Sequence, residues 1–269
     1  MPSNDIKTHG VDYILPSDIP TRTGYTFRGW GSRSDSTSPI NGPTSMGFSG
    51  YYSENADYTY YAVWTPITYT VQYNGNGATS GSMINSTHTY DTAKKLTANA
   101  YQRKYTVTYN YNESGVSNTT ATATATFNGW AESATGSKVY DNEASVKNLK
   151  STQDAVVDLY ANWTLGTVTL PTPTRTGYTF NGWYTAASGG TRVGVGGATY
   201  QPTTNTILYA RWTTNTYYVT WNLNDGTGST LTYQTLVDYD STYGDLPTPT
   251  RTGYTLNGWY TAPSGGTKI

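Results

Sequence analysis

The side chains that could carry acid–base or nucleophilic chemistry are few and scattered. His9 and His88 are the only histidines, and they lie far apart in the chain. Ser49 stands in Gly-Phe-Ser-Gly rather than in the Gly-x-Ser-x-Gly elbow of a serine hydrolase. The absence of Cys excludes a thiol nucleophile and a thiolate metal site. A pair of catalytic carboxylates for glycoside hydrolysis stays open as an alternative, because only the fold sets their separation. Since the sequence shows no other catalytic arrangement, we expect no enzyme.

Two loops resemble ligand-binding loops at first sight. Gly75, Gly77 and Gly81 lack the spacing of a dinucleotide loop, and a strand pattern leads them into Ser, Thr and Asn residues rather than into a helix. Residues 222–226 lack the early acidic ligands and the closing Glu of a calcium loop. Both loops are predicted to be hairpin turns, and we expect no cofactor and no metal ion.

The composition predicts a folded, mainly β chain, α+β at most. Charged residues make up 12% of the sequence, whereas aromatic residues reach 14%, with 27 Tyr and 8 Trp. Disordered chains are poor in aromatic residues, and Tyr and Thr favour strands. Because 16 basic residues balance 17 acidic ones without a basic run, we expect no nucleic-acid partner. No stretch approaches the roughly 20 apolar residues of a membrane span, so we also expect no membrane insertion.

One motif recurs along the chain with a closing element behind it. Gly-Tyr-Thr-Phe/Leu-x-Gly-Trp occurs at residues 24–30, 177–183 and 253–259, and a shorter form, Thr-Phe-Asn-Gly-Trp, occurs at residues 126–130. The first, second and third repeats then close on a Tyr-Ala-x-Trp type of element. Its final residues are Trp64, Trp163 and Trp212. A repeat at this spacing predicts tandem modules.

The repeats divide the chain into four predicted modules. The ranges are 1–65, incomplete at its N-terminal side; 66–164, with an insertion near 103–126; 165–213, a short module; and 214–269, which lacks the closing element. Residues 1–5 have neither the basic start nor the apolar core of a signal peptide. Because the repeats at both ends are incomplete, we interpret the chain as a fragment.

A strand-and-turn pattern opens two of the modules. It occurs at residues 69–77 and 217–226, where alternating residues precede Asn, Asp and Gly. The third module lacks this opening hairpin, because Trp163 is followed almost directly by the Leu-Pro-Thr lead-in. A strand-like stretch from Tyr105 to Thr126 instead delays the motif of the second module. Nothing in the sequence pattern explains that insertion.

These motifs together resemble one known family. A Tyr-Thr-Val strand, a Gly-rich turn, a Leu-Pro lead-in, Gly-Tyr-Thr-Phe-x-Gly-Trp, a Ser-Gly-Gly turn and Leu-Tyr-Ala-x-Trp are similar to the Listeria–Bacteroides repeats, the B repeats of internalin-like surface proteins. The agreement is best at residues 170–212 and 217–267. The resemblance implies small β-grasp-like modules in an elongated array, in secreted or wall-anchored bacterial proteins. It implies no catalytic residue.

The repeated aromatic residues are predicted to form the core of each module. Strict strand alternation would place Phe180 and Trp183 on opposite faces, and we expect Trp183 to pack against Trp212 and Tyr178. The predicted structural core residues are Tyr25, Phe27, Trp30, Trp64, Phe127, Trp130, Trp163, Tyr178, Phe180, Trp183, Trp212, Tyr254 and Trp259. An exposed sugar-stacking platform is the alternative, and it applies more to the unrepeated tyrosines Tyr51, Tyr52, Tyr58, Tyr60, Tyr111 and Tyr239.

Two functions follow from these observations. The first is a non-catalytic stalk or spacer in an extracellular or cell-surface bacterial protein. The second is an adhesin-like module whose exposed Tyr and Trp bind a glycan or a host-surface protein. The sequence does not indicate which oligomeric state the protein has.

Overall fold

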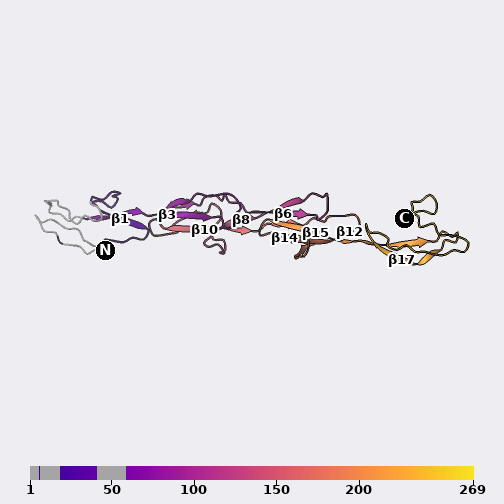
Figure 1. The fold of residues 1–269 in the computed structure, drawn as a ribbon. Helices are drawn as coiled ribbons and strands as arrows, with labels where there is room; N and C mark the ends of the chain where they lie inside the picture. Colours follow the sequence, from indigo (N-terminus) through magenta and orange to yellow (C-terminus); the bar gives the residue numbers. More distant parts are fainter. Residues whose placement is uncertain (1–5, 7–18, 41–58) are drawn as a thin grey trace. The chain divides into compact units, whose positions relative to one another are not determined.

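The structure, a computed structural model, describes residues 6, 19–40 and 59–269 and is built from strands (Figure 1). No helix occurs in this part of the chain, so none is long and apolar enough to span a membrane there. The prediction of a mainly β fold is confirmed. The finer β-grasp assignment is not confirmed by the strand arrangement.

The chain folds into two compact units, and each unit is made of two separate segments of the sequence. Unit 1 consists of residues 1–104 and 124–166, and unit 2 consists of residues 105–123 and 167–269. The stretch 105–123 therefore lies inside the sequence of unit 1 but belongs to unit 2. We describe each unit by itself.

Unit 1 contains a two-stranded ribbon and a four-stranded sheet. Its strands are β1 (Tyr25–Gly31), β2 (Tyr61–Pro66), β3 (Thr68–Asn74), β4 (Ser86–Thr89), β5 (Lys94–Lys95), β8 (Thr126–Ala131), β9 (Ser145–Val146) and β10 (Val156–Thr164). Strands β1 and β2 pair antiparallel and form the first module. The four-stranded sheet has the order β4-β3-β10-β8 and forms the second module with the short pair β5-β9.

The core of the second module follows from alternation in its central strands. In β3, Tyr69, Val71 and Tyr73 are buried while their neighbours face outward. They pack with Trp130 of β8 and Leu159 of β10 in one cluster. Because few aliphatic residues are available, large aromatic rings supply much of the buried area.

Unit 2 repeats this arrangement. Its strands are β6 (Lys104–Asn110), β7 (Thr119–Thr124), β11 (Val168–Thr169), β12 (Tyr178–Tyr184), β13 (Arg192–Gly194), β14 (Thr199–Tyr200), β15 (Thr206–Thr214), β16 (Thr216–Asn222) and β17 (Thr230–Asp238). The sheet order β13-β12-β15-β6-β7 has the same succession as β8-β10-β3-β4 in unit 1, with β13 added at the edge. This sheet and the pair β11-β14 form the third module.

The inserted stretch is thus the opening hairpin of the third module. Strand β6 pairs parallel with β15, as β3 pairs parallel with β10. Val107 and Tyr109 of β6 are buried in one cluster with Trp183 and Leu208. The expectation that the third module lacks such a hairpin was wrong, because the hairpin comes from an earlier place in the sequence.

The turns of three hairpins show the same side-chain contact. The amides of Asn76, Asn112 and Asn224 each donate to the Oδ1 of the Asn two residues earlier, at 2.8 Å. All three residues have positive φ, between 44° and 53°, which Asn tolerates better than most residues. The loop at 222–226 is therefore a hairpin turn in the structure, as the sequence predicts.

The fourth module consists of the antiparallel pair β16-β17 and the segment 247–269. Trp221 of β16 packs against Trp259 of that segment, with ring centroids 4.9 Å apart. Both indoles are largely buried, at 2% and 9% exposure. Within the described residues, this Trp pair carries the core of the module.

Candidate functional site

The chemically active side chains do not gather into a catalytic site in the described part of the chain. No group of three His, Asp or Glu residues that could hold a metal ion occurs there. His9 and Ser49 lie outside the described residues.

His88 is the one histidine that the structure describes, and it is fully buried on β4. Its ring stacks on Tyr69 at a centroid distance of 5.5 Å, and its Nε2 lies 3.0 Å from the Ser86 hydroxyl. Burial, helped by the charge of Lys94, lowers the pKa of His88 below its ordinary value. A neutral ring packed against Tyr69 contributes to the core and has no access to a substrate.

The repeated aromatic residues occupy different depths. Trp130 and Trp183 are fully buried, and Phe27 and Trp259 are nearly so. Tyr254 is 68% exposed, so it lies at the surface of the fourth module. The remaining predicted residues are half-buried: Tyr25, Trp30, Trp64, Phe127, Trp163, Tyr178, Phe180 and Trp212.

A β-bulge changes how the Phe and Trp of the motif face. The register shifts between Phe180 and Gly182, and Gly182 has a φ of 128°. As a result the rings of Phe180 and Trp183 touch edge to face, 5.6 Å apart, instead of lying on opposite faces. The same contact joins Phe27 to Trp30 at 5.4 Å and Phe127 to Trp130 at 5.0 Å. Strict alternation is therefore wrong at this motif.

The closing Trp of each complete module binds the turn of its own opening hairpin. The indole N–H of Trp163 donates to the Gly75 carbonyl, and that of Trp212 donates to the Tyr111 carbonyl, both at 2.9 Å. Trp183 itself packs against Tyr109 and Tyr111. Trp212 and Phe180 pack against the same buried cluster as Trp183.

The residues that precede the motif, Thr97 in the second module and Pro171 in the third, bond different buried polar groups. Pro171 accepts the Trp183 indole N–H at 2.8 Å but has no N–H of its own, and the buried Tyr109 hydroxyl has no partner. In the second module, Thr97 donates its amide to the Tyr73 hydroxyl at 2.8 Å, whereas the Trp130 indole N–H is left without a partner. Pro171 has no amide to offer Tyr109, whereas Thr97 supplies one to the Tyr73 hydroxyl.

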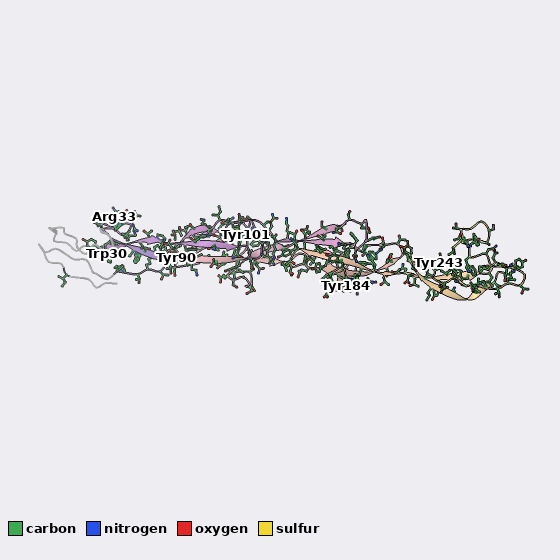
Figure 2. The ribbon with its side chains drawn as sticks, in the orientation of Figure 1. Trp30, Arg33, Tyr90, Tyr101, Tyr184 and Tyr243 are labelled. Atoms are coloured by element: carbon green, nitrogen blue, oxygen red, sulfur yellow. The ribbon has the colours of Figure 1, made fainter. Side chains whose placement is uncertain are left out.

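The first and second modules meet at a defined junction within unit 1. The Gly24 carbonyl accepts from the Ile67 amide, and the Ile67 carbonyl accepts from the Tyr90 amide, both at 3.0 Å. The Tyr90 ring, labelled in Figure 2, covers Gly24 so closely that a Cβ there would overlap it. Tyr25 packs edge to face on Tyr90 at 5.8 Å. A glycine is needed at this position both for its φ of 77° and for the ring.

The third and fourth modules meet in the same way within unit 2. The Gly177 carbonyl accepts from the Asn215 amide, and the Asn215 carbonyl accepts from the Tyr239 amide, both at 2.8 Å. The Tyr239 ring covers Gly177 and packs edge to face on Tyr178 at 5.9 Å. The two junctions therefore use the same positions and the same backbone bonds.

An Arg three residues before the Tyr of the motif supports the ring of that Tyr in three places. The guanidinium of Arg22 lies 3.6 Å from the centroid of the Tyr25 ring, and those of Arg175 and Arg251 lie 3.7 and 3.9 Å from Tyr178 and Tyr254. In each case the Tyr amide also donates to the Arg carbonyl across a tight turn. These cation–π contacts orient the Tyr rings that two of the junctions use.

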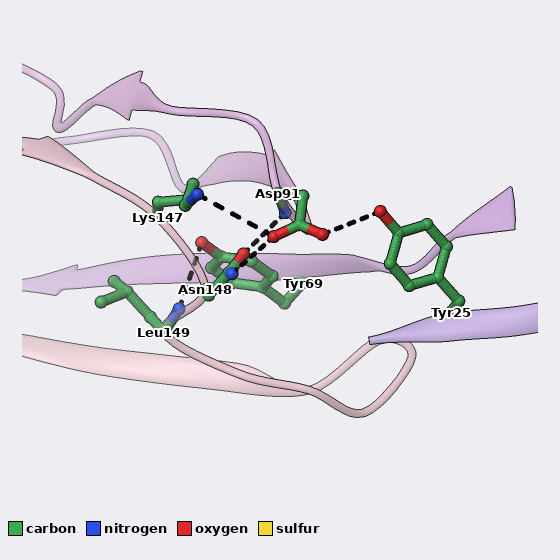
Figure 3. Close-up of polar contacts among 6 residues, drawn as sticks. All are labelled: Tyr25, Tyr69, Asp91, Lys147, Asn148 and Leu149. Atoms are coloured by element: carbon green, nitrogen blue, oxygen red, sulfur yellow. Dashed lines mark hydrogen bonds and ion pairs between the residues drawn. The ribbon is translucent and has the colours of Figure 1, made fainter. Parts of the chain in front are cut away.

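Asp91 adds a polar contact that only the first junction has among the described residues (Figure 3). Its carboxylate accepts from the Asn148 side chain and from the Tyr25 hydroxyl, each at 2.8 Å, and lies 4.0 Å from the Lys147 amine. These hydrogen bonds, from Asn148 first and then Tyr25, lower the pKa of Asp91. Tyr25 thus links β1 of the first module to a polar cluster of the second.

Two of the unrepeated tyrosines make structural contacts in the described part of the chain. Tyr111 bonds to Thr119 and packs on Trp183, and Tyr239 belongs to a junction. Tyr60 is half-buried, whereas Tyr51, Tyr52 and Tyr58 lie outside the described residues. Other exposed aromatic and aliphatic side chains gather in the fourth module, namely Tyr217, Tyr218, Leu236, Tyr243, Tyr254, Leu256 and Tyr260.

Sequence reasoning missed the junctions, although a signal was present. Tyr90-Asp91 and Tyr239-Asp240 stand at corresponding places just after the second strand of an opening hairpin. Asp91 and Asp240 also share a positive φ, 59° and 61°. A Tyr-Asp pair repeated at a strand end could have been singled out as a contact with the neighbouring module.

Comparison with known proteins agrees with the repeat pattern. A family model described as the Listeria-Bacteroides repeat domain matches residues 3–63, 160–211 and 217–269. The chain is 42% identical to Internalin H of Listeria monocytogenes over 98 residues, which are 36% of this chain and 16% of that protein. It is 27% identical to a Gly-rich membrane protein of Evansella cellulosilytica over 287 aligned residues, which cover 97% of this chain and 30% of that protein. The chain thus spans less than a third of either relative, and no solved structure matches it.

Proposed function

The chain belongs to the Listeria-Bacteroides repeat domain family, and from that premise we propose that it is a non-catalytic spacer of a bacterial surface or secreted protein. The relative named Internalin H supports this class of protein. In this function the modules hold other parts of the protein at a distance, so what matters is how firmly each module is joined to the next.

The repeated junction is the observation that carries the proposal. Gly24 with Tyr90, and Gly177 with Tyr239, use the same two backbone bonds and the same ring contact. A joint that is built the same way twice, with a ring seated on a glycine, restricts the angle between neighbouring modules more than a flexible linker does. Restricted joints are the property that a spacer requires.

Distance measurements between paired spin labels test the stiffness of the first junction. The chain has no Cys, so Arg28→Cys with Thr87→Cys places the two labels on exposed positions of β1 and β4. Thr87→Cys with Asp158→Cys is the matched pair inside the second module. We expect both pairs to give similarly narrow distance distributions. A broad distribution for the first pair alone would contradict a restricted joint.

An adhesin-like function is the second candidate, and the exposed side chains of the fourth module favour it. Tyr218 and Leu236 are register partners on β16 and β17, and they are 68% and 60% exposed. Aromatic rings of this kind can stack on sugars. A glycan array and a host-surface pull-down with the purified chain distinguish the two functions. Saturable binding that Tyr218→Ser abolishes supports the adhesin, whereas no binding in either assay supports the spacer.

A further inference from the structure

The second module has an unusual relation between its chain entry and its chain exit. The first strand of the module is β3 and its last is β10, with the stretch 105–123 of unit 2 between them in sequence, and these two strands are parallel neighbours in the middle of the sheet. Five residue pairs are in register, from Val156 with Thr70 to Tyr160 with Asn74. Parallel strands begin at the same end, so the entry at Thr68 and the exit at Thr164 lie at opposite ends of the pair.

This placement decides how tension along the chain acts on the module. A pull on the start of β3 and on the end of β10 slides the two strands past each other. The hydrogen bonds between them then carry the load together. A pull at one end of the pair instead opens these bonds one after another.

Additional bonds fasten both ends of the pair. At the entry, the Thr68 carbonyl accepts from the Asp154 amide at 2.9 Å. The Thr68 amide donates to Gln153 Oε1 at 3.1 Å, and Gln153 Nε2 donates to the Thr68 hydroxyl at 3.0 Å. At the exit, Trp163 donates to the Gly75 carbonyl at 2.9 Å, and Asn76 donates to the Ala161 carbonyl at 3.0 Å. Sliding the strands must break these contacts as well.

The third module repeats the arrangement with the hairpin at 105–123. Strands β6 and β15 are parallel, in register from Val107 with Thr206 to Asn110 with Tyr209. The Thr106 amide donates to Asn205 at 2.9 Å at one end, and Trp212 donates to the Tyr111 carbonyl at 2.9 Å at the other. Both modules thus fasten a central parallel pair at each end.

We infer that the parallel pair β3-β10 is a load-bearing clamp, which keeps the module folded under tension along the chain. The pair β6-β15 has the same construction. The inference rests on the proposed spacer function, because a spacer between a surface and a bound object transmits force. The clamp adds to that function a resistance to unfolding that is high when the force acts along the parallel strands and low when it acts at one end of the pair.

Single-molecule force spectroscopy with two attachment geometries tests the clamp. Thr65→Cys with Thr164→Cys loads the pair lengthwise, whereas Thr65→Cys with Val156→Cys pulls at one end of it. All three positions are exposed, and the sequence contains no other Cys. Because forced unfolding reports the barrier along the pulled direction, we expect the lengthwise geometry to need at least about twice the force at the same loading rate.

The comparison is valid only if both double variants keep the same thermal unfolding midpoint, which serves as the control. Equal forces in the two geometries, or a lower force lengthwise, would overturn the clamp. That result would leave the spacer function standing, because the label distances and the binding assays test the spacer independently.

Discussion

Gly177 lies so close to the Tyr239 ring that a side chain at this glycine would overlap the ring, and Gly24 stands in the same relation to Tyr90. Both glycines also have a positive φ, 78° and 77°. The Gly of the repeated motif is therefore required for a turn and for the contact with the next module. These two requirements can be separated by mutation, because the motif occurs again at Gly253 without a ring over it.

Gly177→Ala should weaken the junction by about 1–3 kcal/mol, because Ala both strains the positive φ and collides with Tyr239. Gly253→Ala is the matched control, since Gly253 has a φ of 80° but nothing within 4 Å of the added Cβ. The loss of stability in each variant is measured by chemical unfolding in which the hydrogen exchange of β16 and β17 is monitored. Equal losses in the two variants would mean that the ring contact adds nothing.

The strands and the core Trp residues could be predicted because their signals are local. The alternation in residues 69–74 gives the buried face of β3, and Trp183 is buried as its recurrence suggests. Parallel pairing is not local, since Thr70 and Val156 are partners far apart in the sequence. The bulge at Gly182 was missed because a glycine in a strand permits a bulge without requiring one.

The inserted hairpin shows a different limit of sequence reasoning. Tyr105-Thr-Val-Thr-Tyr-Asn110 resembles Tyr69-Thr-Val-Gln-Tyr-Asn74, so the sequence itself marks an opening hairpin. Because consecutive elements usually pair with each other, its position inside the second repeat predicts a partner strand in that repeat rather than in the third. Only the pairing of β6 with β15 assigns it to the third module.

Val107→Asp should unfold the sheet of the third module although Val107 lies within the second repeat in sequence. Val107 is fully buried against the core of unit 2, and an unpaired buried charge costs about 3 kcal/mol or more. Hydrogen-exchange mass spectrometry should show lost protection in β12 and β15 and retained protection in β3 and β10. Val71→Asp is the reciprocal variant, and it should expose β3 and β10 instead. Loss of protection in β10 caused by Val107→Asp would contradict the strand assignment.

Tyr25→Phe should raise the pKa of the Asp91 carboxyl toward its ordinary value, because the hydroxyl that donates to the carboxylate is removed. Since the folded-state pKa of Asp91 is lowered, its contribution to stability is present above the unfolded pKa of 3.8 and is lost as the pH falls through the folded value. Titration of Asp91 by NMR measures the change directly. Asn148→Ala removes the hydrogen bond that lowers the Asp91 pKa most, so it should raise this pKa more than Tyr25→Phe does. An unchanged Asp91 pKa in Tyr25→Phe would show that the junction bond does not form in solution.

His88 should make the stability of unit 1 sensitive to mild acid. Burial lowers its folded-state pKa below the unfolded value of 6.5, so the unfolded chain binds the extra proton. Stability is then complete above pH 6.5 and falls as the pH drops below that value toward the folded pKa, by at most about 1.4 kcal/mol per pH unit. His88→Val should flatten this dependence, because it removes the group that titrates. Val is chosen because Val237 stands opposite Tyr217 in the β16-β17 pair, as His88 stands opposite Tyr69 in the β3-β4 pair. Urea unfolding of both proteins between pH 7.5 and pH 5 is the measurement, and His9 is common to the two chains. If the two curves keep a constant separation across this range, the buried neutral His88 is not the source of the acid sensitivity.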